Sequence, residues 1–134
     1  AERANYILKK GAQCEIFYTH WRALNLVSDL LCGPERFLAY VKPCETRDEL
    51  LKEPWIEGCV IVDKPAKLLN FWSSELPNIS SVMAICVDEI SEIWPGWQVT
   101  QLKRRMYDAE ELLGIKYYHP EYFTEIGVCT KKEI

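Results

Sequence analysis

The stretch from Glu92 to Val99 constrains the fold more than any other part of this chain, because an apolar helical pattern stops there and an alternating strand pattern starts. Two of the five tryptophans, Trp94 and Trp97, flank a Pro-Gly pair in this stretch. A proline cannot continue a helix, and a glycine can adopt the positive φ that a sharp reversal requires. We therefore predict a corner at which two large aromatic side chains fix a helix to the strand that follows it.

The length of 134 residues and the hydrophobic fraction of 49% fit one folded domain. No run approaches the ~20 apolar residues of a membrane span, and the first residues have no apolar run of the signal-peptide kind. None of the six cysteines forms a C-x-x-C pair, and several sit inside apolar runs, where cysteine behaves as a small buried hydrophobe. We expect a single domain over residues 1–134, with 115–134 as a peripheral tail, and a cytoplasmic location in which the thiols stay reduced.

The periodicity of apolar residues predicts an α+β fold, with a mostly antiparallel sheet of about five strands packed by roughly two to four helices. The expected order is ββα(α)ββαβα. The predicted strands are 5–10, 13–18, 58–63, 67–72 and 97–102, and the first four form two hairpins. The predicted helices are 33–41, a short one after Thr46, 79–94 and 107–113, the last with Gly114 as its C-cap. The segment 19–28 is ambiguous.

Acidic side chains concentrate in the middle of the chain, whose formal net charge is −4. Residues 44–75 carry seven acidic and four basic side chains, and residues 76–100 carry three acidic and no basic ones. Phosphate contacts require clustered lysine and arginine, so this distribution disfavours nucleic acid as a partner. It favours a basic protein partner, or no charged partner at all.

Compact catalytic and phosphate-binding motifs are missing from the sequence: there is no G-x-x-x-x-G-K-[ST], G-x-G-x-x-G or G-x-S-x-G. The two histidines, His20 and His119, do not have metal-ligand spacing. A nucleophilic Cys14 or Cys59 paired with His20 is conceivable, but Cys59 sits in a run typical of a core strand. We therefore expect no metal, no cofactor and no catalytic residue, and the chain is not predicted to be an enzyme.

Aromatic side chains lie at the ends of predicted elements and in loops, among them Trp55 and Trp72. Tryptophan at such positions commonly anchors protein interfaces, and the alternative is that it anchors a loop to the core. Asp88, Glu89 and Glu92 share one predicted helix, where they form either a solvated face or a binding surface.

Several motifs together resemble those of small, uncharacterised bacterial proteins. The most distinctive are Y-x-H-W at residues 18–21 and W-P-G-W at residues 94–97, accompanied by Gly33-Pro34-Glu35 and by the segments 55–63 and 68–72. The resemblance runs from about residue 5 to residue 114. Proteins of this kind often resemble immunity proteins of polymorphic or contact-dependent toxin systems. The resemblance implies an antitoxin that neutralises a toxin domain by binding it, and it implies no catalytic residues.

We accordingly predict that a cognate, basic toxin domain is the partner, with neither nucleic acid nor membrane as a partner. Acidic residues would steer the encounter and tryptophans would anchor the complex; the predicted partner-binding residues are Trp55, Glu57, Trp72, Asp88, Glu89 and Glu92. Two alternatives stay open: a small enzyme or enzyme-like immunity protein with a pocket near His20, and a module that binds a small ligand in an aromatic cavity near Trp21, Trp72 and Trp97. The sequence leaves the oligomeric state open.

Overall fold

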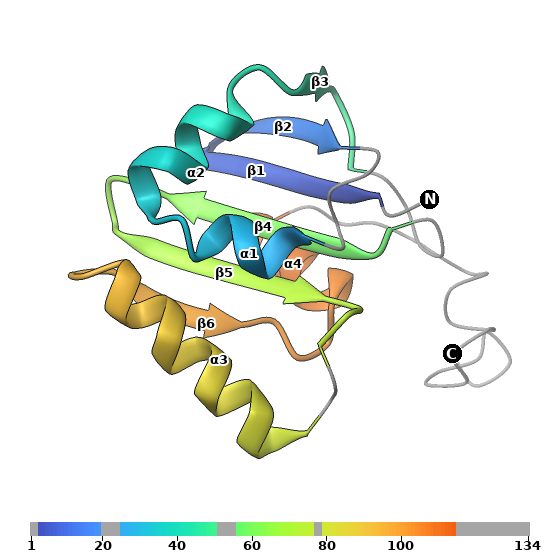
Figure 1. The fold of residues 1–134 in the computed structure, drawn as a ribbon. Helices are drawn as coiled ribbons and strands as arrows, with labels where there is room; N and C mark the ends of the chain where they lie inside the picture. The colour runs from blue at the N-terminus through green and yellow to red at the C-terminus, as the bar shows by residue number, and fades with distance from the viewer. Residues whose placement is uncertain (1–2, 20–24, 51–55, 77–78, 115–134) are drawn as a thin grey trace, which may run out of the picture.

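The computed structural model describes residues 3–19, 25–50, 56–76 and 79–114. These residues contain a six-stranded mixed sheet in the order β3-β2-β1-β4-β5-β6, with helices against it (Figure 1). The pairs β1–β2, β2–β3 and β4–β5 are antiparallel, whereas β1–β4 and β5–β6 are parallel. The strands are β1 Ala4–Lys10, β2 Gln13–Thr19, β3 Glu45–Arg47, β4 Gly58–Asp63, β5 Leu68–Ser73 and β6 Gln98–Gln101, and the helices are α1 Leu26–Leu30, α2 Pro34–Val41, α3 Ser80–Ile93 and α4 Met106–Leu113.

The two faces of the sheet are covered by different helices (Figure 1). On the first face, side chains of α1, α2 and α3 pack on alternate residues of β1, β4 and β5, including Tyr6, Val60 and Phe71. On the second face, Met106 and Ala109 of α4 pack on the intervening strand residues. All six residues of β4 are buried, as expected for a central strand that is covered on both faces.

Most of the predicted elements are confirmed, including both hairpins, the helix now labelled α3 and the short helix α4, which ends at Gly114 in the left-handed conformation. The α+β class is also confirmed. None of the described helices combines the length and apolar character that crossing a bilayer requires.

Three predictions about the sheet require correction. The sheet has six strands, its pairing is mixed, and the described element order is ββααβββαβα. The sixth strand is β3, which overlaps the place where a short helix after Thr46 was predicted. Its three residues are exposed and polar, so their periodicity contains no strand signal; they are extended because they pair with β2.

Trp94 joins three helices and a strand in the core below the corner that the sequence indicated. It is fully buried, and its indole nitrogen donates a hydrogen bond of 2.7 Å to the carbonyl oxygen of Leu30 at the end of α1. Its ring lies 5.9 Å from that of Phe37 in α2 and 4.9 Å from that of Trp97. Gly96 makes the reversal between them with a φ of 84°. The predicted corner is therefore confirmed. Besides linking α3 to β6, Trp94 also contacts α1 and α2.

We expect Trp94→Phe to lower the free energy of unfolding by about 2–3 kcal/mol, because it removes a buried hydrogen bond and leaves a void. Trp72→Phe is the matched control, since Trp72 is also buried but its indole nitrogen has no hydrogen-bond partner among the described residues. It should cost about 1 kcal/mol less than Trp94→Phe, measured by urea denaturation. Equal losses would show that the bond to Leu30 contributes nothing to stability.

Candidate functional site

The structure brings together three of the six predicted partner-binding residues. Asp88, Glu89 and Glu92 are exposed on α3, which lies on the first face of the sheet (Figure 1). Glu57 is half-buried and immediately precedes β4, and its position in the strand alternation places it on the second face. Trp55 lies outside the described residues. The six residues therefore do not form one surface among the residues described.

Trp72 lies inside the protein. Only 2% of it is exposed, and it packs in the second-face cluster with Cys59 and Met106. The guanidinium carbon of Arg105 lies 5.3 Å from the centre of its ring, a cation–π geometry. The backbone at Arg105 has a φ of 51°, an unusual value for a residue with a side chain. Trp72 thus serves as a core residue beneath Arg105, and the structure gives it no surface from which to anchor a partner.

The exposed apolar residues of α3 are the feature that sequence reasoning missed. Ile79, Val82 and Ile93 follow the same 3.6-residue apolar period as the buried residues, yet they are 54%, 37% and 43% exposed. Ile85 is 59% exposed. Within α3 only Met83 and Ile90 are buried. The available signal was the breadth of the apolar arc, which is wider than one contact with a sheet can cover.

Six exposed residues on the outer side and on one flank of α3 are called the α3 face: Val82, Ile85, Asp88, Glu89, Glu92 and Ile93. By the ~3.6-residue period of a helix, Ile85, Asp88 and Glu92 lie opposite the buried Met83 and Ile90. The other three lie on the flank of α3 that faces α1 and α2. The face combines three carboxylates with three apolar side chains, and no lysine or arginine occurs between residues 76 and 100. It is a surface suited to bind a protein that offers both positive charge and apolar contacts.

Cys86 lies beside the α3 face, and the pKa of its thiol depends on the charge of that face. Burial raises the pKa of the Cys86 thiol, and the negative charge of Glu89 raises it further. Both effects disfavour the thiolate, so this cysteine is a poor nucleophile at neutral pH.

Substitution of Glu89 tests whether its negative charge raises the pKa of Cys86. We expect Glu89→Gln to lower the pKa of Cys86 and to increase its alkylation rate at mildly alkaline pH by about twofold, the effect of a partly exposed charge. The pH at which the rate is half-maximal should move down, because less alkaline solution then suffices to form the thiolate. Alkylation is followed by mass spectrometry of the peptide that contains Cys86. Asp88→Asn is the control and should leave the rate unchanged; an equal rise in both variants would contradict a specific role for Glu89.

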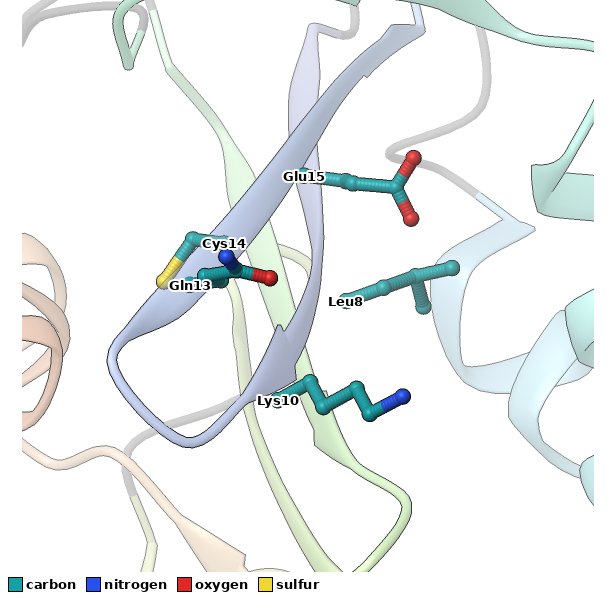
Figure 2. Close-up of a pocket in the computed structure, with 5 residues that line it drawn as sticks. All are labelled: Leu8, Lys10, Gln13, Cys14 and Glu15. Carbon is teal, nitrogen blue, oxygen red and sulfur yellow. The ribbon is translucent and has the colours of Figure 1, made fainter.

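A hollow of about 430 Å³ lies at the turn of the β1–β2 hairpin (Figure 2). It is lined by Leu8, Lys10, Gln13, Cys14 and Glu15. Leu8 and Glu15 are direct cross-strand partners, and Figure 2 shows Leu8, Lys10 and Glu15 extending to one side of the hairpin while Cys14 extends to the other. One cation, one carboxylate and one thiol at a turn do not form a nucleophile–base arrangement.

No metal-binding cluster occurs in the described part of the chain, where no three His, Cys, Asp or Glu side chains are grouped as ligands. Among the cysteines that the structure describes, Cys59 is fully buried in β4. His20 and His119 lie outside the described residues, as does Trp21. Trp72 and Trp97 pack in clusters on opposite faces of the sheet, so they cannot line one aromatic cavity.

Comparison with known proteins adds little. No family model matches the sequence, and no curated protein matches it. One solved NMR structure, that of a protein designated TA0956, is similar with 14% sequence identity and a TM-score of 0.42, over 75% of this chain and 96% of that one. A similarity at this level carries no conclusion about function.

Proposed function

We propose that this chain is an immunity protein that neutralises a basic toxin domain by binding it directly at the α3 face. The observation that supports this most strongly is the pairing of exposed Val82, Ile85 and Ile93 with three carboxylates on one surface. The proposal keeps Asp88, Glu89 and Glu92 from the sequence-based set. It replaces the tryptophan anchors by the apolar residues of α3.

The two kinds of side chain would have different tasks. Carboxylates at an interface steer the encounter and raise the association rate, whereas apolar side chains that become fully desolvated slow dissociation. A toxin that acts on an anionic substrate has a basic active-site cleft, and an acidic face with an apolar centre is complementary to the rim of such a cleft. Neutralisation would then follow from covering the cleft, with no chemistry performed by this chain.

The effect of the carboxylates of the α3 face on the association rate can be separated from the effect of the net charge of the whole chain. The partner is first identified by a tagged pull-down from the native host, with mass spectrometry of what co-purifies. We then expect Asp88→Lys/Glu92→Lys to slow association at least about tenfold at low ionic strength, and less at high salt. The matched control is Asp48→Lys/Glu49→Lys, which changes the net charge equally at exposed positions just after β3, the opposite edge strand of the sheet. Similar rates for the two double variants would contradict binding at the α3 face.

The apolar residues give a second, independent readout. Ile85→Ser should leave the association rate nearly unchanged and raise the dissociation rate about tenfold or more, because a desolvated aliphatic anchor is lost. The side chain is more than half exposed, so the variant should fold with nearly the stability of the native chain. Kinetics measured on a sensor surface distinguish the two effects, and an unchanged dissociation rate would remove Ile85 from the interface.

A further inference from the structure

Strand β6 is an edge strand of the sheet. It is the last strand in the sheet order, and no strand pairs with its outer side in the part of the chain that the structure describes. Gln98 and Leu102 donate their backbone N–H groups inward to the carbonyl oxygens of Lys67 and Phe71 in the β5 region, at 2.9 and 2.7 Å. Because these groups alternate along a strand, Val99 and Gln101 direct their N–H and C=O groups outward.

The two edges of the sheet differ in how they discourage pairing with another chain. The β3 edge is three residues long, carries the ion pair Glu45–Arg47, and is followed by Asp48 and Glu49. Charges and shortness are the usual protection of an edge strand. The β6 edge reads Gln98-Val99-Thr100-Gln101, with no charged residue and no proline. Nothing in its sequence disfavours the addition of another strand.

The helix beside this edge also allows a close approach. Ile93 lies next to Gly33 in the turn between α1 and α2, where its Cγ2 is 3.5 Å from the position that a Cβ on Gly33 would occupy. This contact defines the flank of α3 that faces the other helices. By the helical period, the small residues Ser80, Ala84 and Ser91 lie on the opposite flank, toward the edge of the sheet. Small side chains on that flank leave room for a neighbouring molecule.

We infer that two copies of this chain pair through β6, in antiparallel orientation, to form a symmetric dimer with one continuous sheet. The occupant is a second copy because the edge is complementary to itself. When Val99 of one copy lies opposite Gln101 of the other, all the outward backbone groups of both residues are used, in four hydrogen bonds. Thr100 then lies on the two-fold axis and faces Thr100 of the second copy in a pair with no backbone hydrogen bond, where side chains are closest.

The charges at the ends of β6 fit the same arrangement. Lys103 is exposed just after the strand, whereas Glu92 is exposed in the last turn of α3, just before the corner that leads into it. Antiparallel pairing brings the end that carries Lys103 to the end of the second copy near Glu92. Opposite charges are therefore brought together at both ends of the interface, while parallel pairing would place like charges together.

The two-fold axis gives a test that needs no knowledge of any other partner. Sedimentation of the full chain at increasing concentration should show the mass rising from 15.6 kDa toward twice that value. Thr100→Lys and Thr100→Glu each place like charges face to face, and each should weaken the dimer about fivefold or more. An equimolar mixture of the two variants should form a heterodimer at least as strong as the native dimer, because the facing charges are then opposite.

Gln98 supplies the matched control for this charge swap. It is exposed, and it lies on the same face of β6 as Thr100. In the proposed register it faces Leu102 of the second copy, so mixing Gln98→Lys with Gln98→Glu should give no such recovery. A native chain that stays monomeric at every concentration would overturn the proposal, as would a dimer that the Thr100 variants leave unchanged. If the native chain is monomeric but these variants weaken binding of the co-purified toxin, the edge pairs with the toxin and the self-pairing is wrong.

Discussion

The arrangement of the helical layer depends on one buried side chain, Trp94. Its indole N–H bonds the end of α1, and its ring packs against Phe37 of α2 and against Trp97 just before β6. Trp94 therefore fixes the C-terminal end of α3 to α1, to α2 and to the residue just before β6. The rest of α3 has no comparable attachment, since Met83 and Ile90 are its only buried residues. A long apolar helix held in this way leaves much of its apolar surface in the solvent, and that surface is the candidate site.

The elements that the sequence predicted correctly are those with strong local signals. The run from Gly58 to Asp63 is apolar because both faces of β4 are covered, and α3 has a clear helical period. The pairings that were missed depend on residues far apart. Parallel pairing of β1 with β4 joins Ala4 to Gly58 across the intervening helices, and β3 is extended only because β2 lies beside it. No local pattern encodes either contact, so the number of strands and the mixed pairing could not be derived.

The candidate site was predictable in its charges and not in its apolar part. Exposed carboxylates on a helix follow from sequence, because a charge seldom lies buried without a partner. The place of a tryptophan does not follow, because burial is decided by the neighbouring strand. Trp72 pairs in register with Cys59, which lies on the face covered by α4, and this contact removes it from the surface. Conversely, Ile85 is exposed because α3 contacts the sheet along a stripe narrower than its apolar arc.

The circumference of α3 is thereby divided into an inner side, an outer face and a flank at the sheet edge. The inner side carries Met83 and Ile90, and the outer face carries the acidic and apolar residues proposed to bind a toxin. The small residues of the flank lie toward the edge at which a second copy would add. A dimer formed through β6 would use Glu92 of this face in its contact with Lys103 of the second copy and would keep the rest of the face, including Val82 and Ile85, outside its interface. Two such faces held in one rigid sheet would bind a toxin carrying two basic sites more tightly than one face alone, by raising the effective concentration of the second face.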